Sequence, residues 1–296
     1  MTGICANRVV VVTGAGRGLG RAHALAFAAE GAAVVVNDLG AALDGAGASD
    51  APAREVVAEI EAAGGRAVAH GGDIATAEGA SSLIATALET YGRLDTLVNN
   101  AGFLRDRMLV NLTEDDWDAV VRVHLRGHFL PLKHAAAHWR AETRAGRPAA
   151  ARVIGTTSGA GLLGSVGQGN YSAAKAGIVA LTLVAAAELG RYGVGVNAIA
   201  PAARTRMTEG GFAGLRGLPE DVSPLVVWLG SGGSEGVTGR VFEVEGGRVT
   251  VMEGWRRGAS AEAPARWTPE SAGATARTLL STTPPPLPPY GSTPTP

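Results

Sequence analysis

Two residues of this sequence, Tyr171 and Lys175 in NYSAAKAG (170–177), have the types and spacing needed for proton transfer. Side chains four residues apart on a helix lie on one face as neighbours. A free phenol has a pKa near ~10, and a lysine ammonium about 4 Å away can lower that pKa by ~3 units. A tyrosine tuned in this way can take a proton from an alcohol as hydride leaves, or return one to a ketone. The chain has only two lysines among its 26 basic residues, which favours a specific role for this ammonium.

A serine that can reach the same point is Ser158, thirteen residues before Tyr171 at the end of a predicted strand. Its hydroxyl is suited to hydrogen-bond a substrate oxygen and to stabilise developing charge. The intervening GAGLLGSVGQG is rich in glycine and can bring the two side chains together. By itself such a serine is more often a polar strand end, so the prediction depends on Ser158, Tyr171 and Lys175 jointly.

A glycine-rich turn near the N-terminus, VVTGAGRGLGRAHALAF, predicts a phosphate site. Its glycines allow a close backbone approach to a diphosphate, and the helix that follows offers free N–H groups and a positive dipole end. Asp38 follows about twenty residues later, where a carboxylate accepts both ribose hydroxyls of NAD and repels the 2′-phosphate of NADP. The alternatives are that Asp38 only caps the next turn, or that Arg17 in the loop favours that phosphate.

Two further strand ends fit the same cleft. Asp73 ends the third predicted strand and can hydrogen-bond an adenine, while NNAG (99–102) ends the fourth. The Ala101–Gly102 backbone permits close approach to the adenosine half of a dinucleotide. Asn99 has two open interpretations, a cofactor contact or a structural tie between neighbouring strands.

The apolar pattern predicts the scaffold for these residues. Short apolar runs alternate with longer Ala/Leu-rich stretches, as in a parallel sheet with helices on both faces. Strands are predicted at 8–13, 32–38, 66–73, 94–100, 151–158, 194–201 and 240–246, and helices near 19–30, 52–63, 75–91, 113–140, 171–190 and 221–230. We therefore predict an α/β fold, a single Rossmann-type doubly wound parallel sheet of about seven strands. Ligands of such sheets bind beyond the carboxyl ends of the strands.

Composition argues against several classes of function. The net charge is −1 without runs of like charge, which argues against nucleic acid or an anionic membrane as a partner. A single cysteine, Cys5, excludes an internal disulfide and fits a reducing compartment. The N-terminus lacks the layout of a signal peptide, and no apolar run is expected to span a membrane. We expect a cytoplasmic protein, and we predict no metal site.

The composition changes near residue 258. The last 33 residues hold 9 of the 15 prolines, with Ser, Thr and Gly between them. Such a segment buries too little apolar surface to offset its ordering entropy. We predict a catalytic domain over 1–257 and a disordered or polyproline II tail over 258–296, in which PPPLPP is either inert or docks on an aromatic groove.

The motifs TGAGRGLG, NNAG and YSAAK, with Ser158 at this spacing, resemble the short-chain dehydrogenase/reductase family over residues 8 to about 250. TGRVFEVEGG resembles the last strand of that family. Five further stretches are similar to its branch of (3R)-hydroxyacyl-CoA dehydrogenase modules in peroxisomal multifunctional enzymes of type 2, which use NAD: VVVNDLG, FLRDRM, WDAVVRVHLRGHF, GSVGQGNYSAAKAG and APAARTRMTEG.

The resemblance implies a role for each matching residue. Tyr171 is the implied general acid/base, Lys175 its activator and Ser158 the holder of the carbonyl. NAD is the expected cofactor, with NADP less favoured. Its contacts are expected from Thr13, Gly14, Gly16, Arg17, Gly18, Leu19, Gly20, Asp38, Asp73, Ile74, Asn99, Ala101, Gly102, Tyr171, Lys175, Pro201 and Thr205.

The sequence departs from the family in two places. His124 stands where most members have an asparagine that helps to hold a water leading to the lysine. It is either a packed helix histidine or a member of the catalytic set that acts through its carbonyl or as a proton relay. PAART replaces the usual Pro-Gly, but Pro201 can still turn the chain toward the nicotinamide, with Thr205 as a carboxamide contact.

The expected activity is NAD-dependent transfer of hydride between a secondary alcohol or ketone and nicotinamide, with a 3-hydroxyacyl-CoA as one candidate substrate. The alternative is an NAD(P)H-dependent ketoreductase of specialised metabolite or steroid metabolism. A cofactor-sensing protein without the chemistry is disfavoured because Tyr171 and Lys175 are both present. The alanine-rich 171–190 and the family resemblance predict a homodimer or homotetramer, and the short glycine-rich segment between Thr205 and Pro219 is expected to shape the substrate mouth.

Overall fold

The computed structural model describes residues 3–41, 47, 49–204, 217–263 and 266–291. Its centre is an eight-stranded sheet in the order β3-β2-β1-β4-β5-β6-β7-β8. The strands are β1 (Val9–Thr13), β2 (Ala33–Asn37), β3 (Arg66–His70), β4 (Thr96–Asn99), β5 (Arg152–Thr156), β6 (Gly195–Ala202), β7 (Val241–Glu245) and β8 (Arg248–Met252). The first seven are parallel, which confirms the predicted doubly wound sheet. β8 pairs antiparallel with β7 and was not predicted.

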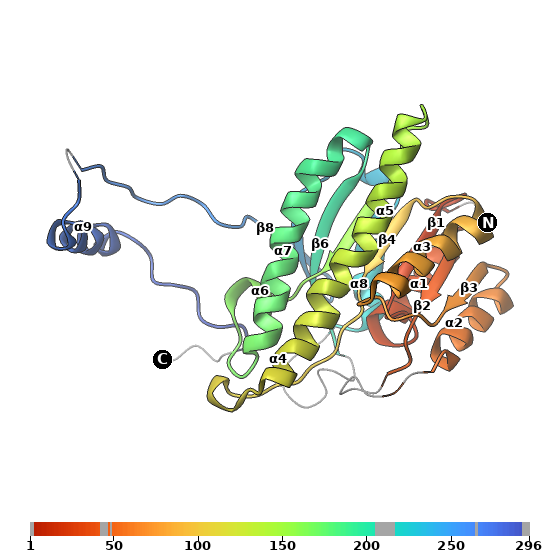
Figure 1. Cartoon of the computed structure of the whole chain (residues 1–296), viewed down its shortest axis with the longest axis horizontal. Coiled ribbons are helices and arrows are strands. Elements are labelled where there is room, and N and C mark those ends of the chain that lie inside the picture. The colour runs from red at the N-terminus through yellow and green to blue at the C-terminus, as the bar shows by residue number, and fades with distance from the viewer. Residues whose placement is uncertain (1–2, 42–46, 48, 205–216, 264–265, 292–296) are drawn as a thin grey trace.

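Alternate residues of the central strands pack against two helical layers (Figure 1). Val10 and Val12 face a cluster that includes α1 (Gly18–Ala29), α2 (Ala51–Ala62) and α8 (Pro219–Gly230). Val9 and Val11 face a second cluster with α3 (Ala77–Tyr91), α5 (Gly127–Arg144) and α7 (Gly169–Leu189). Successive side chains of a strand point to opposite faces, so a run of valines supplies both cores.

The helix predicted over 113–140 is broken into three parts. α4 (Glu114–Val121) leads into a π-helical turn, η2 (Arg122–Arg126), before α5 begins. π-turns are rare and occur mostly at functional sites, because the wider turn re-aims side chains. The buried side chain that this turn carries is His124.

Some elements carry no strong sequence signal. α6 (Gly159–Leu163) follows β5, and three short 3-10 helices lie at η1 (Leu109–Asn111), η3 (Gly190–Tyr192) and η4 (Gly232–Ser234). In the predicted tail, α9 (Pro269–Ser281) starts with a capping box at Thr268 and projects away from the sheet (Figure 1). The division of the chain at residues 257 and 258 stays a prediction.

One helix is long and apolar enough to span a membrane, although the sequence analysis expected no such run. The stretch Gly169–Tyr192, which is α7 with the turn after it, has a mean hydropathy of 1.6 and could cross a membrane by length and composition. In this fold α7 packs against β5, β6 and the helices beside it.

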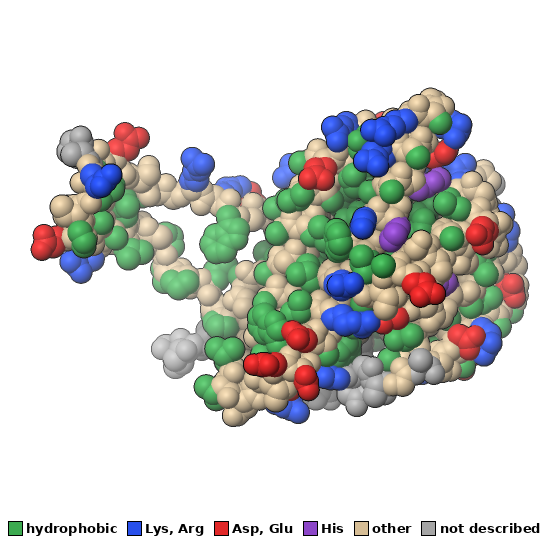
Figure 2. All heavy atoms as spheres, viewed as in Figure 1, with side chains coloured by type: hydrophobic (Ala, Val, Ile, Leu, Met, Phe, Trp, Pro, Cys, Tyr) green, Lys and Arg blue, Asp and Glu red, His purple; other side chains and the backbone are tan. Residues whose placement is uncertain are grey.

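Figure 2 shows acidic and basic side chains interspersed over the visible face of the domain, with apolar groups between them.

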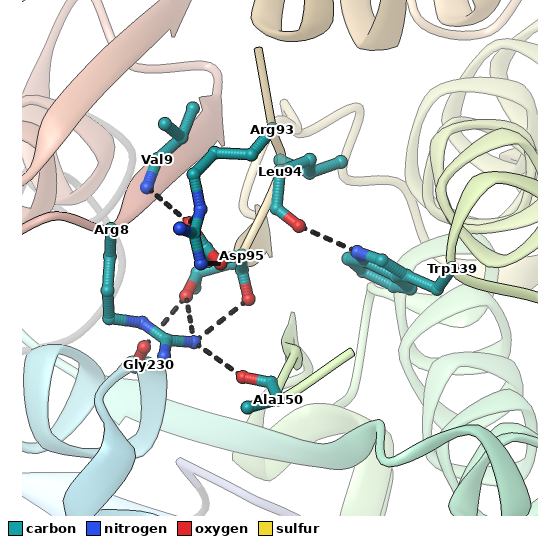
Figure 3. Close-up of polar contacts among 9 residues, drawn as sticks. Arg8, Val9, Arg93, Leu94, Asp95, Trp139, Ala150 and Gly230 are labelled. Atoms are coloured by element: carbon teal, nitrogen blue, oxygen red, sulfur yellow. Dashed lines mark hydrogen bonds and ion pairs between the residues drawn. The ribbon is translucent and has the colours of Figure 1, made fainter. Parts of the chain in front are cut away.

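The amino ends of β1 and β4 are fixed by a polar cluster on the sheet edge opposite the carboxyl ends (Figure 3). The Asp95 carboxylate accepts from the backbone N–H of Val9 at 2.8 Å and from Arg93 Nε at 2.8 Å and Nη2 at 2.7 Å. Arg8 Nη2 donates to the carbonyls of Asp95 and Ala150, each at 3.0 Å. Because Asp95 is 6% exposed, these bonds are shielded from water and hold three strands in register.

We expect Asp95→Ala to lower the free energy of unfolding by about 2–4 kcal/mol, because a buried N–H loses its acceptor and a guanidinium its partner. Urea denaturation of the purified protein measures this. The matched control is Glu59→Ala, which removes an ion pair to Arg21 on the surface and should cost less than about 1 kcal/mol. Equal losses in the two variants would contradict the structural role of Asp95.

Candidate active site

A cavity of about 760 Å³ opens at the carboxyl ends of the parallel strands. Most of the predicted site residues line it: Gly14, Gly16, Arg17, Gly18, Leu19, Asp38, Asp73, Ile74, Ala101, Gly102, His124, Ser158, Tyr171, Lys175 and Pro201. The strand order places Asp73 and Asp38 at one end of the cavity and Ser158 and Pro201 at the other. Thr205 lies outside the described residues.

Three predicted cofactor residues stand behind the cavity wall. Thr13 Oγ1 accepts from the N–H groups of Asn100 at 2.9 Å and Ala101 at 3.2 Å, which ties the ends of β1 and β4 together. Asn99 Nδ2 donates to the carbonyl of His128 at 3.1 Å, so the structural-tie interpretation describes its contact. A Cβ on Gly20 would lie 2.1 Å from the carbonyl oxygen of Gly14, so Gly20 is needed for the loop to pack on the helix.

The start of α1 has the properties of an anion site. Gly14 and Gly18 have positive φ angles of 62° and 53°, which bend the loop across the cavity. Within the described chain no side chain caps α1 and its first turn holds no acid, so its N–H groups and positive dipole end face the cavity uncompensated. These residues fit the diphosphate of a dinucleotide.

Both carboxylates at this end are held by the protein. Asp38 Oδ2 accepts from the N–H of Gly16 at 2.8 Å and Oδ1 from that of Gly40 at 2.7 Å. Asp38 therefore caps a turn and lines the cavity at once, so the two interpretations of this residue are compatible. Asp73 Oδ2 pairs with Arg122 at 2.5 Å, a cavity residue that the sequence analysis missed.

Ser158, Tyr171 and Lys175 converge at the other end. Tyr171 and Lys175 share a face of α7, and Lys175 Nζ lies 5.4 Å from the centroid of the Tyr171 ring. Lys175 is 2% exposed, and its ammonium donates to the carbonyl of Thr156 at 2.6 Å. Ser158 caps α6, with its hydroxyl accepting from the N–H of Ala160 at 3.2 Å, and its side chain lies close enough to Tyr171 to lower the pKa of that phenol. The loop between them does bring the serine and tyrosine together.

The pKa values of this pair run against the expectation from sequence. Burial raises the pKa of Tyr171 to about 12, against the lowering effect of the Ser158 hydrogen bond. Burial also lowers the pKa of Lys175 to about 7, so near neutrality its charge is only partly present. The predicted lowering of the Tyr171 pKa is therefore wrong for the protein groups alone, because removal of both groups from water costs more than their attraction returns.

His124 is a buried, neutral member of the site. Its pKa is held well below the ordinary value, first by burial and then by the charge of Lys175. The ring stands edge-on to that of Tyr171, with the centroids 5.1 Å apart, and Nε2 lies 2.7 Å from the carbonyl oxygen of Phe103. Among the described residues, Nδ1 finds no hydrogen-bond partner. This histidine packs against the tyrosine and contributes to the cavity wall.

Gly102 has a packing role that the sequence analysis did not foresee. A Cβ at this position would lie 2.0 Å from Cε1 of His124, so a glycine is needed for the imidazole to stand beside Tyr171. Gly102 also lines the cavity, and its close approach to an adenosine stays a prediction.

Sequence reasoning missed other lining residues. Gln168 donates through Nε2 to Asp106 Oδ2 at 2.8 Å, and Phe103 and Thr156 complete the wall near His124 and Lys175. Tyr290 reaches the cavity from the C-terminal tail. No local pattern marks Tyr290, because it meets Gly159 and Gly164 across more than a hundred positions of the chain. Among the described residues there is no group of three or more His, Cys, Asp or Glu side chains that could hold a metal ion.

Comparison with known proteins decides the family, since the model of short chain dehydrogenases matches residues 8–213. The chain belongs to the short-chain dehydrogenase family. It is therefore an oxidoreductase that acts on CH–OH groups with a nicotinamide cofactor.

Individual members of the short-chain dehydrogenase family are close to this chain. Hydroxyacyl-CoA dehydrogenase ChsB1 of Mycobacterium tuberculosis is 49% identical over 83% of this chain and 80% of its own length. Peroxisomal multifunctional enzyme type 2 of Mus musculus is 44% identical over 85% of this chain, which spans 33% of that longer protein. The crystal structure of a short chain dehydrogenase from Mycobacterium avium superposes with a TM-score of 0.90 at 60% identity, covering 98% of this chain and all of that one.

The lowered pKa of Lys175 predicts a dependence of stability on pH. In the unfolded chain this lysine titrates near ~10.4, so between about pH 7 and 10 the unfolded state binds more protons and the native state gains stability as pH rises. Below about pH 7 both states are protonated, and the full cost of burying the ammonium remains. Relative to a Lys175→Met variant, the wild type should gain up to about 1.4 kcal/mol of unfolding free energy per pH unit in that window.

Denaturant unfolding at pH 6, 7, 8 and 9 measures this difference. Lys133→Met, at the exposed lysine on α5, controls for the loss of one positive charge. A wild type that parallels Lys175→Met at every pH would show that the buried amine keeps its ordinary titration.

Proposed function

We propose that the protein oxidises the 3-hydroxyl group of a 3-hydroxyacyl thioester, such as a 3-hydroxyacyl-CoA, with NAD. The observation that carries this proposal is the meeting of Ser158, Tyr171 and Lys175 in a cavity whose other end presents the start of α1 and Asp38. The thioester class is supported by the names of ChsB1 and of the peroxisomal enzyme, which are relatives along most of this chain.

In the proposed reaction, the hydride of a C–H bond and the proton of an O–H bond go to two different acceptors. The start of α1 and Asp38 would hold the diphosphate and ribose of NAD, whose oxidised nicotinamide would supply the acceptor for the hydride of the carbinol carbon. The Tyr171 oxygen takes the hydroxyl proton, so that the carbonyl forms as the C–H bond breaks. Ser158, whose side chain lies beside Tyr171, holds the substrate oxygen next to the phenol and stabilises its developing charge.

The proposed role of Lys175 is electrostatic and positional. A positive charge beside a phenol favours the phenolate, so both the ammonium and an oxidised nicotinamide oppose the effect of burial on Tyr171. The bond from Nζ to the carbonyl of Thr156 fixes the amine on the cavity wall. A compact ammonium has three donors, which leaves capacity for a ribose hydroxyl.

A specific observation favours an alternative. Arg17 lines the cavity near Asp38, and a guanidinium there suits the 2′-phosphate of NADP. In that case the protein is an NADPH-dependent ketoreductase of a specialised metabolite or steroid, with the same residues returning the proton to a ketone. NAD remains our proposal, because the Asp38 carboxylate is fixed by two backbone N–H groups and would repel that phosphate.

We also propose a homodimer or homotetramer. Leu183 and Val184 on α7 are 51% and 53% exposed, and Phe129 on α5 is 45% exposed, so apolar surface remains on two helices of one layer. A cytoplasmic location stays a prediction.

The proposed substrate class is tested by turnover. The protein is mixed with NAD and 3-hydroxyacyl-CoAs of several chain lengths, and in parallel with NADPH and a set of ketones and ketosteroids. We expect NADH to form with the acyl-CoA panel. Consumption of NADPH with ketones alone would favour the ketoreductase.

We expect Tyr171→Phe to lower kcat by about a thousandfold or more while the Kd for NAD changes less than about twofold, because only the proton acceptor is lost. Stopped-flow turnover and fluorescence titration with NAD measure the two quantities. Tyr91→Phe, which removes a phenol at the end of α3 outside the cavity lining, is the control. Near-normal turnover of Tyr171→Phe would overturn the assignment of the acid/base.

Asp38→Asn keeps the size of the side chain and removes its charge. It should lower kcat/KM for NAD about tenfold to a hundredfold, and so reduce the preference of the enzyme for NAD over NADP. Steady-state kinetics with both cofactors give the ratio, and Glu59→Gln on α2, outside the cavity lining, controls for a lost carboxylate. An unchanged ratio would mean that Asp38 acts only as a turn cap.

A further inference from the structure

The C-terminal tail returns to the active-site cavity at Tyr290. The chain leaves the sheet after β8, forms α9 at a distance, and comes back toward α6 (Figure 1). Every residue of 282–291 is exposed except Tyr290, which is half-buried. Tyr290 is the residue of this segment that lines the cavity.

Tyr290 is seated on two glycines that flank α6. Its backbone N–H donates to the carbonyl of Gly164 at 2.8 Å. Its ring covers Gly159, where an added Cβ would lie 2.2 Å from Cε2. Gly159 directly follows Ser158, so the tail is seated on the short helix that the catalytic serine caps.

Tyr290 lies at the end of the cavity where a substrate would react. The ring lies on Gly159, next to Ser158, and the phenol is close enough to Tyr171 to raise the pKa of that residue. Asp38 and Asp73 lie toward β3. Burial, followed by the charges of Glu243 and Glu245 on β7, raises the pKa of Tyr290, so the phenol is neutral at physiological pH and the aromatic ring lines the cavity.

The proline-rich stretch before Tyr290 is suited to deliver it. Residues 284–289 read PPPLPP, and proline-rich segments adopt a stiff, extended polyproline II form. A spacer that is already stiff loses little entropy when its end is fixed, so the backbone bond and the ring contact of Tyr290 hold the tail at a low entropic cost.

We propose that Tyr290 is a specificity residue: its ring forms the substrate wall beside Ser158 and packs on the carbon chain next to the reacting carbinol. The tail thereby closes the side of the site that the sheet leaves open. This inference rests on the proposed function for the identity of the substrate, but the seating of the tail on α6 does not.

The test uses five full-length variants. Tyr290→Ala removes the ring, and Tyr290→Phe keeps it. Gly159→Ala places a methyl group where the ring lies and leaves Tyr290 itself unchanged, so the free end of the tail should yield rather than the helix. The double variant combines Tyr290→Ala with Gly159→Ala. Leu287→Ala, in the same segment and 70% exposed, is the control.

We expect Tyr290→Ala and Gly159→Ala each to raise the KM for the 3-hydroxyacyl substrate about tenfold, with the Kd for NAD unchanged and kcat within about threefold. Tyr290→Phe and Leu287→Ala should keep the wild-type KM. The double variant should resemble either single variant, because the methyl group and the ring act through one contact. Additive losses in the double variant, or a wild-type KM in Tyr290→Ala, would overturn the proposal.

Amide hydrogen exchange on the same samples separates this proposal from the proposed function. The Tyr290 N–H should be protected in the wild type and in Tyr290→Phe, and should exchange freely in Gly159→Ala. If no panel substrate turns over, the thioester function fails, and the KM arm is then run with whichever alcohol or ketone the protein accepts. Free exchange at Tyr290 in the wild type would show that the tail does not occupy the site, and would overturn the inference whatever the substrate.

Discussion

The site depends on the burial of two titratable groups, because burial disfavours the charged form of each. Lys175 is 2% exposed, and burial holds its pKa at about 7 while raising that of Tyr171 to about 12. Neither shift is a gain in stability, because each records the cost of removing a charge from water. A fold retains such a cost where a charge arriving with a ligand can reverse it.

The rest of the structure supplies the stability that offsets the cost of burying these two groups. The two apolar layers and the Asp95 cluster fix the strands at the edge away from the site. At the carboxyl edge several buried polar atoms lack partners within the described part of the chain. Four buried polar atoms close to Lys175 in the fold have no hydrogen-bond partner among the described residues: Asn99 Oδ1, His124 Nδ1, His128 Nδ1 and Thr156 Oγ1. Native structures leave few such atoms, and a group of them marks a region arranged for function rather than for stability.

The sequence predicted what short-range patterns encode. Short apolar runs predicted seven strands, and the four-residue spacing predicted the shared face of Tyr171 and Lys175. Depth of burial is not a local property, so the direction of the Tyr171 pKa was predicted wrongly. The fit of Gly102 against His124 joins residues from two elements, and Tyr290 reaches Gly159 across most of the second half of the chain. Contacts of that range depend on the finished fold, and one sequence carries no pattern for them.

The glycine-rich loop after Ser158 connects chemistry with substrate choice. Flexibility alone would have allowed the serine and tyrosine to meet, but the loop forms α6, whose first residue follows Ser158 and whose C-cap, Gly164, accepts from the tail. A side chain at Gly159 would remove the surface on which Tyr290 lies. The same five-residue helix therefore positions both the Ser158 hydroxyl, which we propose holds the reacting oxygen, and the ring of Tyr290, which we propose forms the substrate wall. A change in the tail can then alter which substrate fits without moving Tyr171 or Lys175, because both of those residues are fixed on α7.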